Sequence, residues 1–113
     1  MKGKPLLPVL RTKKRYVVYE TISKKRITHN QVVKFIVDSF RKNFGIFGLS
    51  SAGIRDTKIY KNNKGVIKVN NKYLDKLRTS MVMIRNINDK KVIIHVIKVS
   101  GILKKAKLML KRE

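Results

Sequence analysis

The order of hydrophobic patterns along the chain constrains its fold more than any other feature. Runs rich in β-branched and aromatic residues, typical of strands, occur at 16–22, 54–60, 66–69 and 92–99. Apolar residues at helical spacing occupy 28–44 and 71–84. This order, β-α-β-β-α-β, is the split βαβ arrangement. We therefore predict an α+β fold, a ferredoxin-like or RRM-like (RNA-recognition-motif-like) sandwich with an antiparallel four-stranded sheet and an extra C-terminal helix at 102–112.

Local signals give expected bounds for the helices and loops. Thr28 followed by Gln31 forms a capping box, which starts the first helix. Gly45 is typical of the position just past a helix end, so we expect the helix to stop there and a loop to follow. Asn71 is expected to cap the second helix, and 86–90 is expected to be a polar loop.

The last predicted strand is apolar on both faces. Alternation places its side chains in two sets, namely Val92, Ile94 and Val96 on one face and Ile93, Ile97 and Val99 on the other. A strand of this kind is covered on both sides. We expect the second face to be covered by the terminal helix, by an N-terminal arm, or by another protein.

The chain length fits one domain. We expect a basic N-terminal arm at 1–15 and a single RRM-like domain at 16–113 that includes the C-terminal basic helix. The absence of cysteine excludes a disulfide framework, a thiolate zinc site and a cysteine nucleophile. No apolar run approaches the ~18 residues of a membrane helix, so we expect a cytoplasmic protein with no membrane partner.

The charge of the chain indicates a polyanionic partner. Its 29 Lys and Arg against 6 Asp and Glu give a formal net charge of +23. Nucleic acid is the obvious counter-charge, because each neutralised phosphate releases counterions. Lys outnumbers Arg, which favours backbone and shape recognition over base reading. Base stacking of the RRM type is not expected, because the third strand lacks the aromatic residues and Tyr16 and Tyr19 point to opposite faces.

Three basic clusters are the candidate RNA contacts. The predicted RNA-binding residues are Arg11, Lys13, Lys14 and Arg15 before the first strand, Lys24, Lys25 and Arg26 after it, and Lys98, Lys104, Lys105, Lys107 and Lys111 near the C-terminus. A single charged run is usually a solvated face. Three such runs in one small chain favour a nucleic-acid-binding surface.

No catalytic constellation or metal-ligand spacing is visible in the sequence. The six acids are scattered, and the two histidines, His29 and His95, are far apart. His29 lies near the predicted start of the first helix, and His95 lies on the apolar fourth strand. We therefore predict no catalytic residue, no metal site and no cofactor bound by this chain, although proximity in the fold could still assemble a site.

Several segments together resemble one known family. They are Leu10-Arg11-Thr12-Lys13-Lys14-Arg15-Tyr16 leading into a strand with Glu20, Ala52-Gly53-Ile54, Leu77-Arg78, Lys91-Val92-Ile93-Ile94, and Val99-Ser100-Gly101-Ile102-Leu103-Lys104-Lys105-Ala106-Lys107. In this order they resemble the archaeal ribonuclease P protein component 2 family, which is related to a small precursor-RNA-processing subunit of eukaryotic ribonuclease P. The strand end Val-Ser-Gly leading into a Lys-rich helix is the most specific of these features.

The resemblance implies an RRM-like fold and a role in a ribonucleoprotein. It implies an endonuclease in which the RNA, with magnesium ions, removes the 5′ leader of precursor tRNA, while the protein is not catalytic alone. It also implies partners: ribonuclease P RNA, precursor tRNA in the holoenzyme, the larger TIM-barrel-like component 3, other ribonuclease P proteins, and self-association within a heterotetramer. Apolar residues expected to meet protein partners are Phe47, Leu49, Ile102, Leu103 and Met109.

Three alternatives remain open from the sequence. A ribosomal or ribosome-associated protein would be equally small and basic. A metal-dependent nuclease would cleave RNA by itself, and the scattered acids argue against it. A DNA architectural protein is disfavoured because no intercalating wedge or recognition helix stands out.

Overall fold

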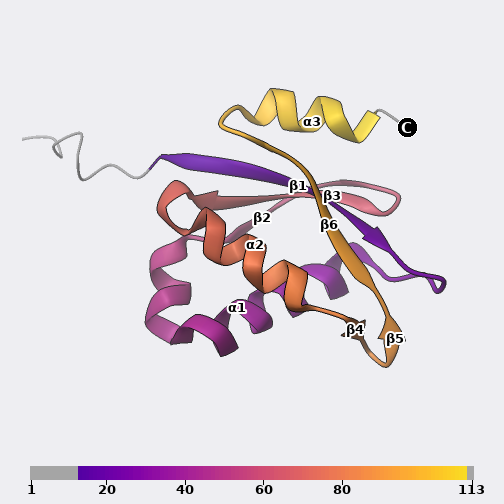
Figure 1. Cartoon of the computed structure of the whole chain (residues 1–113). Helices are drawn as coiled ribbons and strands as arrows, with labels where there is room; N and C mark the ends of the chain where they lie inside the picture. Colours follow the sequence, from indigo (N-terminus) through magenta and orange to yellow (C-terminus); the bar gives the residue numbers. More distant parts are fainter. Residues whose placement is uncertain (1–12, 112–113) are drawn as a thin grey trace, which may run out of the picture.

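The computed structural model describes residues 13–111 and has the predicted α+β architecture (Figure 1). Its four-stranded antiparallel sheet has the order β2-β3-β1-β6. These strands are β1 (Lys14–Ile22), β2 (Arg55–Lys61), β3 (Lys64–Asn70) and β6 (Ile93–Ser100). The helices are α1 (His29–Ala52), α2 (Leu74–Met83) and α3 (Leu103–Lys111), with a 3₁₀ turn at Asn71–Tyr73 before α2. The predicted fold class is confirmed.

β1 lies inside the sheet, between β3 and β6. Its residues at 17–19 are buried on both faces, as expected for a strand that other elements cover from both sides. The strand begins earlier than predicted, because Lys14 and Arg15 already pair with the end of β3. The end of the predicted arm therefore belongs to the sheet, and 1–12 lies outside the described residues.

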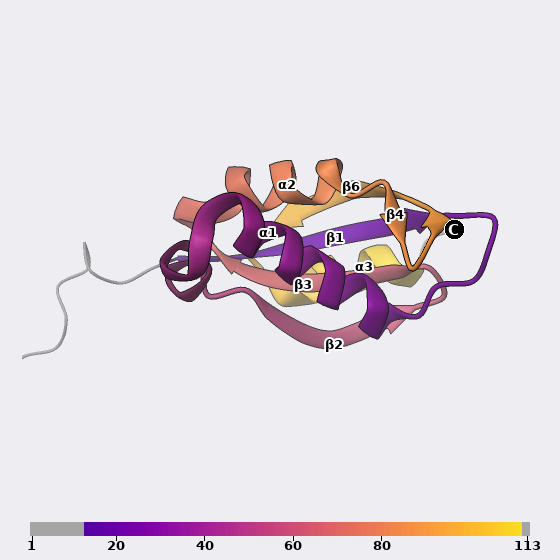
Figure 2. The same cartoon turned by 90° about the horizontal axis from the view of Figure 1, so that it is seen from below.

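Two helices, α1 and α2, cover one face of the sheet (Figure 2). The predicted capping box is present: the Gln31 N–H donates to Thr28 Oγ1, and the Thr28 N–H donates to Gln31 Oε1. The fully buried side chains of this core include Val17, Tyr19, Val32, Ile36, Phe40, Ile67, Val69, Leu77, Met81 and Ile87. This is the larger of the two cores of the domain.

α1 does not end at Gly45, and that prediction is wrong. Gly45 has φ 79° and ψ 172°, so the helix is kinked there, but it resumes and continues to Ala52. The helix ends at Gly53, which has the left-handed conformation (φ 61°, ψ 35°) typical of a C-cap. Leu49 and Ala52 pack against the core, and this burial explains why the chain returns to a helix after the glycine.

The start of the second helical segment also differs from the prediction. Asn71 opens a 3₁₀ turn and does not cap α2. The residue before α2 is Tyr73, which makes no side-chain capping hydrogen bond. The neighbouring Asn70 side chain instead donates to the Ser51 carbonyl at 2.7 Å, which ties the end of α1 to the end of β3.

α3 covers the other face of the sheet, which is one of the three coverings that the sequence left open (Figure 1). Val18 and Val66 from the sheet pack with Ala106 and Leu110 from α3. This is the sheet face on which RRM domains stack bases, and here a helix occupies it.

A β-bulge in β6 changes which residues face which core. The register pairs Val18 with Lys98 and Tyr19 with Val96, so Ile97 has no partner on β1. An unpaired extra residue resets the alternation of a strand. Ile97 therefore packs with α3, while Val99 packs with the α1–α2 core, and the prediction that these two share a face is wrong.

The segment predicted as a polar loop at 86–90 contains a small hairpin. Its strands are β4 (Asn86–Ile87) and β5 (Lys90–Lys91). Asn88 and Asp89 both have positive φ, 51° and 66°, which is the pattern of a type I′ turn. The Ile87 side chain is fully buried and anchors the hairpin to the core.

Candidate nucleic-acid interface

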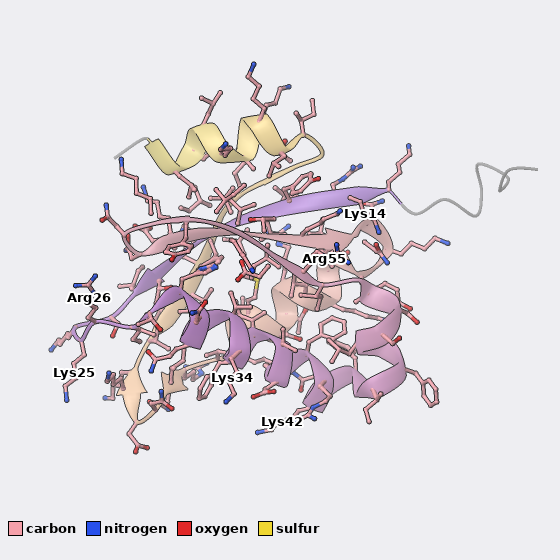
Figure 3. The ribbon with its side chains drawn as sticks, turned by 180° about the vertical axis from the view of Figure 1, so that it is seen from behind. Lys14, Lys25, Arg26, Lys34, Lys42 and Arg55 are labelled. Atoms are coloured by element: carbon pink, nitrogen blue, oxygen red, sulfur yellow. The ribbon has the colours of Figure 1, made fainter. Side chains whose placement is uncertain are left out.

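The first basic group lies where β1 begins and draws on three strands. Lys13 and Lys14 are exposed, and Lys14 Nζ donates a hydrogen bond to the side chain of Asn70. The register places Lys68 of β3 opposite Arg55 of β2. We call Lys13, Lys14, Arg15, Arg55 and Lys68 the strand-start group; Figure 3 shows Lys14 and Arg55 at the same end of the sheet.

Part of this group could not be found from the sequence. Arg55 and Lys68 join it only through the pairing of β2 with β3, which no sequence pattern fixes. The predicted contact Arg11 lies outside the described residues.

The second basic group surrounds the β1–α1 loop. Lys24, Lys25 and Arg26 are exposed on this loop, as predicted, and Figure 3 shows Lys25 and Arg26 pointing away from the domain. The β4–β5 hairpin lies beside the loop, because Lys90 Nζ donates to the Arg26 carbonyl at 3.4 Å. We call Lys24, Lys25, Arg26, Arg85, Lys90 and Lys91 the loop group. Its last three members were not predicted, because a hairpin was not expected there.

The third basic group lies on α3 and on the neighbouring part of β6. Lys104, Lys105 and Lys107 are exposed on α3, and Lys98 is exposed on β6 opposite Val18, on which α3 packs. We call these four lysines the helix group. Lys111 also lies in α3, and its side chain is outside the described part of the structure.

Two ion pairs of residues 13–111 lie outside these groups. Asp38 pairs with Arg41 on the surface of α1 at 3.8 Å, and Asp56 pairs with His29 at 2.8 Å. Neither pair includes a member of the three groups. Each group therefore keeps much of its positive potential for a partner, as a phosphate-binding surface requires.

The apolar residues predicted for protein contacts divide into two sets. Phe47 is 89% exposed just after the α1 kink, and Ile102 is exposed before α3. Leu49 packs against the α1–α2 core, and Leu103 and Met109 pack against the α3 core. The second set thus has a role inside the chain, and Phe47 and Ile102 remain the accessible candidates.

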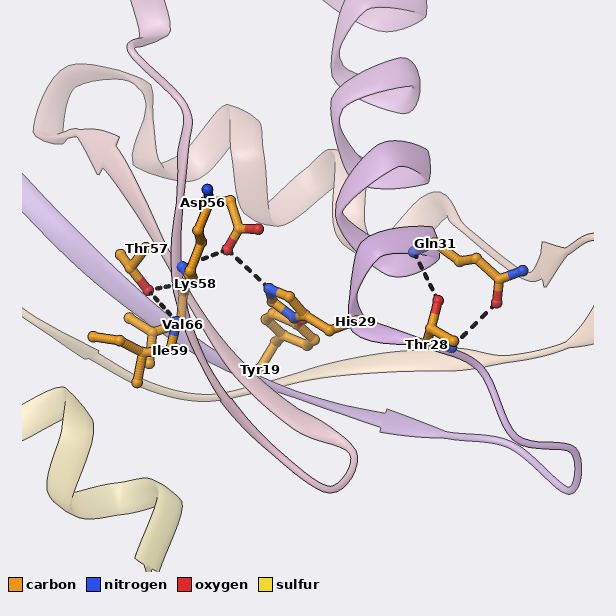
Figure 4. A network of polar contacts seen from close by, with 9 residues as sticks. All are labelled: Tyr19, Thr28, His29, Gln31, Asp56, Thr57, Lys58, Ile59 and Val66. Carbon is orange, nitrogen blue, oxygen red and sulfur yellow. Dashed lines mark hydrogen bonds and ion pairs between the residues drawn. The ribbon is translucent and has the colours of Figure 1, made fainter.

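The fold also assembles a partly buried polar cluster of Tyr19, His29 and Asp56 that the sequence did not reveal (Figure 4). A carboxylate only accepts hydrogen bonds, so His29 Nε2 donates to Asp56 Oδ1 at 2.8 Å. The Tyr19 hydroxyl forms a hydrogen bond with Nδ1 of the same ring. Tyr60 stacks on the His29 ring, with centroids 4.3 Å apart.

A bulge in β2 positions this cluster. Asp56 pairs with Ile67 and Tyr60 with Gly65, so three residues of β2 span the place of one in β3. Lys58 adopts a positive φ of 61°, and its N–H donates to Asp56 Oδ1 at 2.7 Å. The bulge turns Asp56 and Tyr60 toward His29 at the start of α1. A regular strand, as predicted for 54–60, would not do so.

The cluster shifts the ionisation of two of its members. Burial raises the pKa of the Tyr19 phenol, and the nearby Asp56 charge adds to the effect. Burial alone would also raise the pKa of the Asp56 carboxyl. Hydrogen bonds from His29 and from the Lys58 N–H, together with electrostatic attraction to His29 and Lys58, outweigh it and lower that pKa. The cluster therefore links β1, β2 and the start of α1 through a neutral phenol and an ionised carboxylate.

The described part of the chain contains neither a metal-binding cluster nor a helix that could span a membrane. Within residues 13–111, no group of three or more His, Asp or Glu side chains is placed to hold a metal ion. No helix in the same range is long and apolar enough to cross a bilayer.

Comparison with known proteins identifies the family of this chain. The family model described as "Rpp14/Pop5 family" matches residues 15–111, so the chain belongs to the Rpp14/Pop5 family. "Ribonuclease P protein component 2" of Methanosarcina mazei is 35% identical over 103 residues, covering 91% of this chain and 88% of that protein. The protein of the same name from Thermococcus kodakarensis is 30% identical, covering 94% and 89%.

A solved structure agrees with the fold. A chain in the cryo-EM structure of yeast ribonuclease MRP superposes with a TM-score of 0.66 at 14% sequence identity, covering 89% of this chain and 88% of that chain. The resemblance stated from the sequence is therefore confirmed at the level of the family.

Proposed function

We propose that this chain is a protein subunit of ribonuclease P that binds and stabilises the catalytic RNA, so that the RNA removes the 5′ leader of precursor tRNA. The observation that carries the proposal is the similarity to ribonuclease P component 2 proteins over 91% of the chain. The RNA carries the chemistry, with magnesium ions bound to it, and this chain supplies neither a catalytic residue nor a cofactor. The complex would act in the cytoplasm.

The mechanism of assistance is electrostatic. A folded RNA brings phosphates of different helices close together, and their repulsion opposes the fold. Three separate basic groups on one small domain can neutralise phosphates on more than one RNA segment, with release of counterions for each contact. Such contacts position the RNA without reading its sequence.

Protein partners are part of the proposal. Phe47 and Ile102 are large apolar side chains that remain exposed, as expected for residues buried in a complex. We expect them to contact the larger TIM-barrel-like component 3 or other ribonuclease P proteins, and two copies of each subunit could form a heterotetramer.

The proposal is tested by reconstituted cleavage of a precursor tRNA with magnesium. The reactions contain the cognate ribonuclease P RNA and the larger protein partner, with and without this chain, and the chain alone as a control. Leader removal that is stimulated only when all components are present is the expected result. Cleavage by the chain alone would contradict a non-catalytic role, and tight RNA binding without stimulation would favour a ribosomal role.

A further inference from the structure

A hollow lies at the end of the sheet where β1 finishes. The β1–α1 loop and the β4–β5 hairpin enclose a volume of about 800 Å³. Figures 1 and 2 both place the hairpin and this loop at the same end of the domain. The volume is in the range of roughly 300–1,000 Å³ that is typical of small-molecule sites.

The floor of the hollow is apolar and open to solvent. Ile22 and Ile93 are the last residue pair between β1 and β6, and they are 50% and 62% exposed. Val92 beside them is almost fully buried. Two large aliphatic side chains next to each other in water favour a partner with an apolar surface.

The rim of the hollow is cationic. Lys24, Lys25, Arg85 and Lys91 are exposed around it, and Asp89 is the one acid that lines it. An occupant of complementary charge must therefore carry anionic groups beside its apolar surface.

The walls of the hollow are held in place by the fold. The hairpin is anchored by the buried Ile87, and its base is closed by a hydrogen bond from the Val92 N–H to the Arg85 carbonyl at 2.9 Å. The opposite wall is tied to the hairpin through Lys90 Nζ and the Arg26 carbonyl. A site that exists before binding loses little ordering entropy when it is filled.

We propose that this hollow receives an unpaired nucleobase of the RNA partner, with the base on Ile22 and Ile93 and the flanking phosphates on the cationic rim. A nucleotide combines a flat apolar face with a phosphate at short distance, as the floor and rim require. Bases within a duplex are stacked and cannot enter, so single-stranded loops and bulges are the expected targets. The inference rests on the proposed function in one respect, which is that the polyanion is RNA.

The test compares two oligonucleotides of equal charge on the full chain. Fluorescein-labelled hexauridylate and an abasic hexamer with the same sugar–phosphate backbone are titrated by fluorescence anisotropy. The expected result is a hexauridylate affinity that is about 3–30-fold higher, because the base removes apolar surface of Ile22 and Ile93 from water. The Ile22→Ala/Ile93→Ala variant should bring the two affinities together, mainly by weakening hexauridylate.

A matched variant and a second measurement test whether the base-dependent binding occurs at this hollow. Ile46→Ala/Leu108→Ala removes two apolar side chains elsewhere that are also more than half exposed, and it should preserve the difference between the oligonucleotides. In wild-type protein, both oligonucleotides should shift the amide resonances of Lys25 and Arg85 on the rim, whereas only hexauridylate should shift that of Ile93 on the floor. Equal affinities for the two oligonucleotides in wild type, or shifts located elsewhere, would overturn the proposal, including the case in which an acidic peptide fills the hollow.

The two proposals fail in different ways. Stimulated precursor-tRNA cleavage without any base-dependent binding would leave the ribonuclease P role and remove the nucleobase site. Base-dependent binding at the hollow without stimulated cleavage would keep the nucleobase site and remove the ribonuclease P role.

Discussion

The two faces of the sheet are covered very differently. On one face α1 and α2 bury fourteen residues with the strands, including the Tyr19 ring. On the other face the single helix α3 buries a cluster of four, and most of its outward residues are lysines. The first face holds the fold together. The second shields this side of the sheet from water and carries positive charge on α3. RNA contacts are therefore expected at the ends of the sheet and on α3, and not on the part of the sheet that α3 covers.

The largest expected effect on stability comes from truncating a side chain that is buried between the sheet and the helices α1 and α2. Leu77→Ala should lower the free energy of unfolding by about 2–5 kcal/mol, because Leu77 is fully buried in a packed core. Leu110→Ala in the α3 core should cost less, about 1–3 kcal/mol. Denaturant unfolding measures both. Equal losses would mean that α3 belongs to the core as fully as α1 and α2 do.

Gly65 tests how closely the Tyr19 ring packs on the sheet. A Cβ at position 65 would lie 2.5 Å from Tyr19 Oη and 2.7 Å from its Cζ. Gly65→Ala should therefore destabilise the protein by about 1–3 kcal/mol through overpacking. Gly101→Ala is the matched control, because its Cβ would meet only the flexible end of Arg15 at 3.0 Å. Similar thermal stability of the two variants would contradict this packing.

The polar cluster of Tyr19, His29 and Asp56 predicts that stability depends on pH in the acidic range. The pKa of Asp56 is lower in the folded state, so its contribution is fully present above the unfolded value of about 3.9 and is lost as the pH falls through the folded pKa. The stability difference between wild type and Asp56→Asn should accordingly shrink as the pH falls from 6 toward 3. Thermal unfolding at several pH values measures it, and a constant difference would rule out this contribution.

The helix group should have the smallest effect on stability and a clear effect on RNA affinity. Replacing Lys104, Lys105 and Lys107 with Ala should change the free energy of unfolding by about 0.5 kcal/mol or less, because all three are exposed. The slope of log affinity against log salt should fall by up to about one unit per lost phosphate contact.

A charge-matched variant on the opposite side provides the control for the helix group. Lys34, Lys42 and Lys72 are equally exposed on the side of α1 and the 3₁₀ turn, and Figure 3 shows the first two on α1. Replacing them with Ala should leave a steeper salt slope than the helix-group variant. The same slope in both would indicate that net charge alone, and not the position of the lysines, determines binding.

Sequence patterns predicted the fold because each depends on local chemistry. Alternating and helical periodicity, with the capping box at Thr28, identified the elements that build the sheet and its two covering helices. The helix after Gly45 was missed because burial of Leu49 and Ala52, a tertiary effect, outweighs a local stop signal.

The candidate site was predictable only in part. Runs such as Lys24–Arg26 are visible as charge, but Arg55 and Lys68 meet only through strand register. The cluster of Tyr19, His29 and Asp56 depends on a bulge in β2 that leaves no clear sequence signal. Features that rest on register and bulges are set by long-range packing, which a single sequence does not encode in any short pattern.

The most direct test of the unequal roles of the two faces is a map of RNA crosslinks on the chain. Cognate ribonuclease P RNA substituted with 4-thiouridine is photocrosslinked to the protein, and the modified peptides are identified by mass spectrometry. We predict crosslinks in the β1–α1 loop and the adjoining strand ends at Ile22 and Ile93, in the β4–β5 hairpin and in α3. Crosslinks concentrated on Tyr16 and Val66, beneath α3, would contradict this, because they would require α3 to leave the sheet and expose it to bases.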